Sequence, residues 1–130
     1  RAVACDDAAP WMSIEFALFL VALGRDEAVF GVLDAAAAAF PGEPRLWWML
    51  ADRLRSSGRP YAAASAYHRA VACGPELFGV HYDYATLLAE LGRTATAMWA
   101  ARRAQALDPE HPMIGPLLRR LAPRREAASA

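Results

Sequence analysis

Residues 44–77 read PRLWWMLADRLRSSGRPYAAASAYHRAVACGPEL. Apolar residues recur at three- and four-residue spacing in both halves of this stretch, which is the pattern of two amphipathic helices. Gly58 supplies a permissive backbone between the halves, and Pro60 begins the second one, where its missing N–H is not needed. Gly74-Pro75 ends the second half because proline does not continue a helix. The stretch therefore predicts a helical hairpin.

The hairpin is repeated along the chain with a period of 34 residues, which separates Gly24, Gly58 and Gly92. Each of these glycines is followed by arginine, and four further columns keep one residue type in all three units. These columns are Pro41, Pro75 and Pro109; Ala17, Ala51 and Ala85; Leu20, Leu54 and Leu88; and Ala36, Ala70 and Ala104. The period predicts three repeats, at residues 10–43, 44–77 and 78–111.

The ends of the chain continue the same pattern. Arg1–Cys5 repeats Arg69–Cys73 word for word, so residues 1–8 are predicted to be the tail of a preceding repeat in a longer array. Residues 112–121 are predicted to form a capping helix, with Met113, Leu117, Leu118 and Leu121 facing inward and Arg119 and Arg120 facing water. Residues 122–130 have no apolar period and are predicted to be a tail or linker.

These columns resemble the tetratricopeptide repeat (TPR) family. The second repeat carries the family pattern nearly throughout, at Trp47, Leu50, Ala51, Leu54, Gly58, Ala63, Tyr67, Ala70 and Pro75. The outer repeats depart from it at Ser13, Val29, His81 and Ala101, which implies thinner packing there. The resemblance implies an all-α superhelix of antiparallel hairpins whose first helices line a concave side that holds a partner protein.

Composition excludes several other classes of protein. The chain has 130 residues, of which 56% are hydrophobic and 22% charged, so it is predicted to be globular. Its formal net charge is zero, which lacks the basic footprint of a nucleic-acid binder. The longest apolar stretch, residues 16–23, is too short to span a bilayer. All 14 basic residues are arginine, a composition associated with GC-rich bacterial genomes; the cytoplasm is the favoured location.

A search for chemistry finds no catalytic motif, no metal-ligand spacing and no cofactor site, so the chain is predicted not to be an enzyme. His81 falls in a packing column and is predicted to be a packed ring. Cys5 and Cys73 occupy equivalent columns and are predicted to be buried structural thiols, too distant from each other for a disulfide.

What remains is a binding surface. Helical projection places these candidate partner-binding residues in the groove: Arg45, Trp48, Met49, Asp52, Arg55, Tyr82, Asp83 and Thr86. Trp48 is the predicted anchor, since Trp47 is expected to take the core position beside it. A possible end-on contact is formed by Trp11, Ile14 and Leu18, which alternatively pack against a missing upstream repeat. The exposed apolar face of the first repeat also predicts self-association.

Three functions remain open. The leading one is a scaffold that binds a peptide segment or helix of a partner protein, with no nucleic acid and no membrane insertion. The second is a substrate-recruiting or regulatory domain of a larger glycosyltransferase, sulfotransferase or methyltransferase. The third is a small bacterial secretion chaperone, which the repeat fragment at Arg1–Cys5 disfavours. Some TPR proteins grip a carboxyl terminus of heat-shock chaperones with Lys, Asn and Arg. The matching positions here depart from that set: Ile14, Leu18, Met49, Gly79 and Asp83.

Overall fold

The computed structural model describes residues 10–122, apart from the side chains of Pro10, Trp11, Ser13 and Asp26. These residues form seven α-helices and no strand. The helices are α2 (Pro10–Ala22), α3 (Asp26–Ala39), α4 (Pro44–Ser56), α5 (Pro60–Cys73), α6 (Phe78–Glu90), α7 (Thr94–Leu107) and α8 (Ile114–Leu121). The predicted tail of a preceding repeat and nearly all of the predicted C-terminal tail lie outside the described residues.

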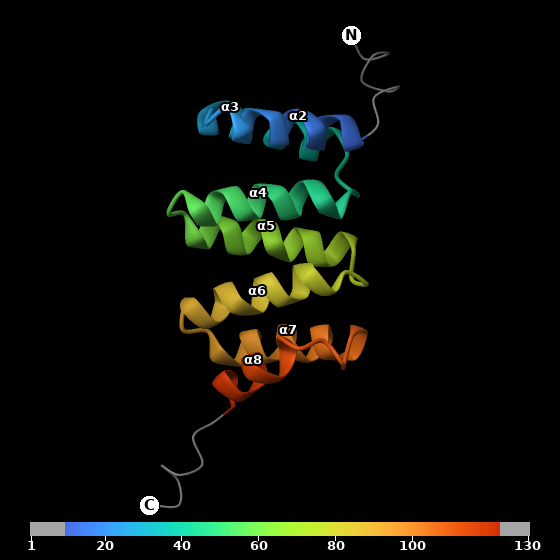
Figure 1. The fold of residues 1–130 in the computed structure, drawn as a ribbon, viewed down its shortest axis with the longest axis vertical. Coiled ribbons are helices and arrows are strands. Elements are labelled where there is room, and N and C mark those ends of the chain that lie inside the picture. The colour runs from blue at the N-terminus through green and yellow to red at the C-terminus, as the bar shows by residue number, and fades with distance from the viewer. Residues whose placement is uncertain (1–9, 123–130) are drawn as a thin grey trace, which may run out of the picture. The chain divides into compact units, whose positions relative to one another are not determined.

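The chain divides into two compact units, the first ending at Pro75 and the second beginning at Glu76. Unit 1 contains two hairpins, α2–α3 and α4–α5, and α4 also packs against α3 and α2 (Figure 1). Small residues let the paired helices approach closely: Ala17, Ala51 and Ala63 are fully buried. The ring of Tyr67 fills the core beside them and is also fully buried, as the family resemblance implies.

Unit 2 contains the α6–α7 hairpin and α8, which packs against both of these helices (Figure 1). Its core again consists of small side chains on α7 packed against leucines on α6. His81 is completely buried, which confirms that it is a packed ring. In α8, Leu117 and Leu121 are buried, as predicted. Met113 was also predicted to face inward, but it precedes the first residue of α8 and its side chain is half exposed.

Each hairpin turns at a glycine in the left-handed region of the backbone. The φ angles are +72° at Gly24, +83° at Gly58 and +80° at Gly92. In the second turn the N–H of Arg59 donates to the carbonyl of Leu54 at 2.9 Å, so a carbonyl at the end of α4 is satisfied. Other residue types rarely adopt this conformation, which explains why glycine recurs at this column.

The position of Trp47 differs from the prediction that it fills the core. Leu46, one residue earlier, is the fully buried residue, and Trp47 is only half-buried. The Trp47 indole instead lies over the loop before α4, where its Nε1 donates to the carbonyl of Pro41 at 3.1 Å. The guanidinium of Arg69 lies 5.0 Å from the centre of the Trp47 ring. Trp47 therefore contacts the loop before α4 and the side of α5, and it contributes less to the buried core than predicted.

Within residues 10–122, none of the helices combines the length and hydropathy needed to span a bilayer.

Candidate functional site

The first helices of the two hairpins in unit 1 contact each other, and helical projection places apolar side chains of both helices on the predicted groove side. We call the surface formed by Ile14, Leu18, Trp48 and Met49 the first-helix surface. Leu18 is 53% exposed, and the other three side chains are half-buried. A half-buried apolar side chain is held in place by its neighbours, and its exposed part can still contact a ligand. Trp11 is the remaining member of the predicted end-on contact. Its side chain is not among those that the structure describes.

Charged residues flank the first-helix surface on α4. Asp52 is exposed, and its carboxylate accepts a hydrogen bond from the buried phenol of Tyr67. This contact holds the carboxylate in one place, which the sequence pattern did not reveal. The Arg45 side chain is exposed, and the Arg45 backbone N–H donates to the Glu43 carboxylate, the cap of α4, at 3.3 Å. Arg55 is half-buried.

The predicted groove residues of unit 2 lie on α6. Tyr82, Asp83 and Thr86 are all half-buried. The hydroxyl of Thr86 donates to the carbonyl of Tyr82 at 2.6 Å, so its hydrogen-bond donor is used within the helix. Thr86 can therefore offer a ligand a methyl group and an acceptor, but not a free donor.

Sequence reasoning missed Phe78, an aromatic neighbour of Tyr82, and His111, which stacks on Phe78. The Phe78 ring stacks on Tyr82, with ring centres 6.0 Å apart, and on His111, with ring centres 4.2 Å apart. Phe78 could have been found from its spacing, since residues four apart share one face of a helix. His111 could not, because it lies in the loop after α7 and meets Phe78 only through folding.

The part of the chain that is described offers little chemistry. It contains no group of three or more His, Cys, Asp or Glu side chains that could hold a metal ion. Burial raises the pKa of the Tyr84 phenol, an effect that the nearby Arg93 opposes, so this group stays protonated at neutral pH. Cys73 was predicted to be buried, but it is only half-buried, because its thiol reaches the linker and donates to the Pro41 carbonyl at 3.0 Å.

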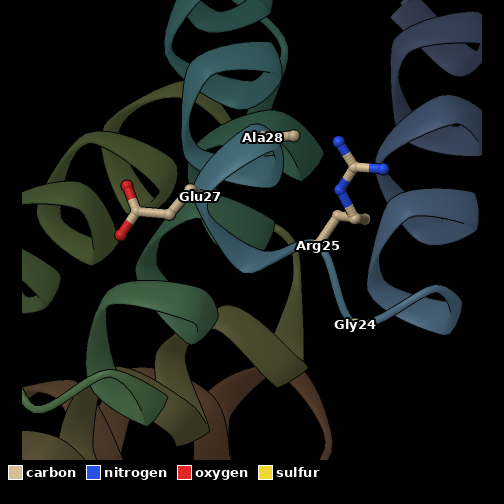
Figure 2. Close-up of a pocket in the computed structure, with 4 residues that line it drawn as sticks. All are labelled: Gly24, Arg25, Glu27 and Ala28. Atoms are coloured by element: carbon tan, nitrogen blue, oxygen red, sulfur yellow. The ribbon is translucent and has the colours of Figure 1, made fainter.

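A shallow hollow lies at the turn between α2 and α3, lined by Gly24, Arg25, Glu27 and Ala28. Figure 2 shows that the Arg25 guanidinium and the Glu27 carboxylate point away from each other across this turn. The two charges do not converge on one point, so the hollow lacks the geometry of an acid–base pair.

Comparisons with known proteins find likeness in structure but not in sequence. No protein-family model matches the chain, and no curated protein matches it. The Yersinia enterocolitica type III secretion chaperone SycD, in complex with a peptide of the translocator YopD, matches with a TM-score of 0.76 and 16% identity. That match covers 92% of this chain and 93% of SycD.

Two further solved structures extend the likeness to other proteins. The first TPR of Spaghetti (RPAP3), bound to the HSP90 peptide SRMEEVD, matches with a TM-score of 0.77 and 16% identity over 93% of this chain and 96% of that one. MamA matches with a TM-score of 0.79 and 12% identity over 98% of this chain and 73% of its own. At such low identity the likeness establishes the fold, and it agrees with the repeat columns read from the sequence. This chain is therefore a TPR-like, all-helical repeat domain.

Proposed function

We propose that this domain is a protein-interaction scaffold, and that its first-helix surface binds a peptide segment or helix of a partner protein. The observation that carries the proposal is the apolar composition of this surface on two contacting helices. Leu18 on α2 is more than half exposed, and Trp48 and Met49 on α4 are half-buried. Tryptophan is enriched among residues that dominate binding energy, and methionine adapts to varied ligand shapes.

The neighbours in structure support this role. SycD was solved with a peptide of the translocator YopD, and the second TPR domain of human RPAP3 with the HSP70 peptide SGPTIEEVD. These ligands belong to those proteins; for this chain they support only the general proposal of peptide binding.

We infer that the ligand is an apolar segment, not a carboxyl terminus held by a cluster of cations. Ile14, Leu18 and Met49 stand where the TPR proteins that bind such termini place polar or charged residues. Apolar side chains of an extended peptide or amphipathic helix match them better. Asp52 and the arginines Arg45 and Arg55 would set the direction of the ligand, because charges at the rim of an interface mainly tune specificity and association rate.

Tyr82, Asp83 and Thr86 are proposed as further contact residues on α6. The stack of Tyr82 on Phe78, which itself stacks on His111, supports a role for Tyr82, since the contact with Phe78 restricts the phenol ring. A preorganised aromatic ring loses less conformational entropy when a ligand binds.

Trp48→Ala tests the proposal. Peptides of about 12 residues selected from a displayed random library against the full chain would be measured by titration calorimetry. Trp48→Ala is expected to weaken a selected peptide by at least about 30-fold, which corresponds to ~2 kcal/mol. Its effect on thermal unfolding should be small, because Trp48 is not part of the fully buried core.

Trp99→Ala is the matched control, since it removes an exposed tryptophan from α7. The anchor role of Trp48 is wrong if Trp48→Ala binds the peptide as tightly as the wild type does, or if it melts far below the wild type.

The other functional readings stay predictions. A recruiting domain of a larger enzyme would use the same surface, with the chemistry outside these residues, and the length of the full gene separates it from a scaffold. Self-association through the first repeat would use another face of α2.

A further inference from the structure

Arginine side chains cover several aromatic rings at the surface of this protein. A guanidinium is attracted to the negative face of an aromatic ring and, being planar, stacks on it. Three such pairs, in which the guanidinium carbon lies 5.0–5.6 Å from the ring centre, are Arg59 on Phe30, Arg69 on Trp47 and Arg103 on Trp99. All three rings are half-buried or exposed, so these arginines cover aromatic surface that water can reach.

Two aromatic rings of α6 carry no such arginine. Phe78 and Tyr82 are both half-buried, and their stacked rings lie 6.0 Å apart, centre to centre. We call these two rings the α6 ring pair. Within residues 76–122, no arginine side chain lies over either ring. The α6 ring pair is therefore aromatic surface that the arginines of its own unit leave uncovered.

The second aromatic neighbour of Phe78 does not oppose a cation. The Nδ1 atom of His111 accepts a hydrogen bond from the backbone N–H of Met113 at 3.2 Å. An imidazole nitrogen that accepts a hydrogen bond carries no proton, so this ring is neutral and its proton is on Nε2. The stack on Phe78 therefore adds no positive charge beside the α6 ring pair.

Carboxylates flank the α6 ring pair and its histidine neighbour along the chain. Glu76 lies two residues before Phe78, and Asp108 and Glu110 lie in the loop that carries His111. Within residues 76–122, none of these three carboxylates has an ion pair. The two arginines of α8 lie in its last turn, whereas His111 precedes its first residue. The N-terminus of α6 contributes roughly half a positive charge, which three full negative charges outweigh.

We propose that the α6 ring pair receives an arginine side chain of the bound partner. The guanidinium stacks on the phenol ring of Tyr82 and is attracted by the surrounding carboxylates, so the subsite combines the ring contact seen elsewhere in this chain with complementary charge. Arginine fits better than lysine, because its planar group both stacks and pairs with carboxylates. The inference rests on the proposed peptide-binding function and adds the chemistry of one subsite to it.

Peptides of about 12 residues selected against the full chain test the subsite. They should contain arginine more often than the unselected library does. Replacing that arginine with citrulline keeps its shape and removes its charge, and this change should weaken binding to the wild-type chain about tenfold in titration calorimetry. In the Tyr82→Leu variant, which lacks the ring, the same replacement should weaken binding less than about threefold.

Two variants serve as controls for the ring. Tyr82→Phe keeps an aromatic face, so the loss on citrulline replacement should stay about tenfold. Tyr61→Leu makes the same tyrosine-to-leucine change at an exposed position of α5 and should leave the loss unchanged. Circular dichroism checks that each variant is folded.

The carboxylates are tested separately. Glu76→Gln and Glu110→Gln should each weaken the arginine peptide about twofold to fivefold, and the citrulline peptide less, because only the first carries a charge. Glu90→Gln is the matched control, since it removes an exposed carboxylate from the other end of α6.

Equal losses on citrulline replacement in the wild type and in Tyr82→Leu would overturn the subsite, because the arginine would then be bound elsewhere. Selected peptides without arginine, with an acidic or an uncharged apolar side chain in its place, would overturn it too. In both cases the effect of Trp48→Ala still decides the scaffold function independently. If no peptide can be selected, the scaffold function is wrong and the subsite falls with it.

Discussion

The phenol of Tyr67, whose ring is fully buried on α5, donates a hydrogen bond to the exposed carboxylate of Asp52 on α4. One contact thus joins the core of the second hairpin to a charge beside the first-helix surface. A hydrogen bond to an ionised group is stronger than a neutral one, but Asp52 can regain water when the bond is lost.

Tyr67→Phe should therefore lower the free energy of unfolding by about 1 kcal/mol, because the ring stays in place and only the hydrogen bond is removed. Urea unfolding measures the change. Asp52→Ala in the Tyr67→Phe background should have almost no further effect on the free energy of unfolding. If the two changes are fully additive in a double-mutant cycle, the hydrogen bond does not contribute to stability.

Tyr67→Ala should lower the free energy of unfolding by roughly 3–5 kcal/mol, the range for truncating a large buried ring. Comparing this loss with that of Tyr67→Phe separates the contribution of the ring to stability from the contribution of the hydroxyl. Urea midpoints of Tyr67→Ala and wild type that agree within error would show that the ring does not support the core.

Gly58→Ala should destabilise the chain by about 1–2 kcal/mol, the cost of a left-handed backbone for a residue with a Cβ. The cost is conformational, because a Cβ at Gly58 would meet no atom within 4 Å. Gly58→Asn should recover part of the loss, since asparagine tolerates this region.

The matched control for the turn is Gly31→Ala in the middle of α3, which also meets no atom within 4 Å but has no positive φ. Alanine is the better helix former, so this change should stabilise the chain by about 0.5–1 kcal/mol. Changes of the same sign at both glycines, measured by thermal unfolding, would contradict the conformational explanation.

Stability should fall at alkaline pH because of Tyr84. Burial raises the pKa of its phenol, and Arg93 only partly opposes this effect. A group whose pKa is higher in the folded chain contributes fully below its unfolded pKa of about 10, and the contribution is lost as pH rises through the folded value. Urea unfolding between about pH 8 and 11.5 measures the loss, and Tyr84→Phe should show a shallower decline than the wild type.

The repeat columns predicted the fold well because each one records a local physical need. Glycine recurs where φ is positive, and alanine recurs where helices touch, as at Ala17, Ala51 and Ala85. The rotation of each helix was harder to predict. Adjacent Leu46 and Trp47 both fit the core pattern, and only packing shows that Leu46 is buried while Trp47 reaches the Pro41 carbonyl.

The sequence predicted which positions form the candidate site. It did not predict which of their hydrogen-bonding groups are already engaged within the protein. The periodicity placed Asp52 and Thr86 on the predicted surface. It could not show that the Tyr67 phenol engages the Asp52 carboxylate or that Tyr82 accepts the Thr86 hydroxyl hydrogen. Such contacts depend on side-chain rotamers, which a spacing rule does not contain.

The Pro41 carbonyl, in the linker between α3 and α4, accepts hydrogen bonds from two side chains. It accepts the indole N–H of Trp47 and the thiol of Cys73, which come from opposite helices of the hairpin that follows. Two side chains of one hairpin, one from each of its helices, thus contact the linker that leads into it. The linker therefore has two independent side-chain attachments, so loss of the Cys73 thiol donor leaves the Trp47 indole donor in place.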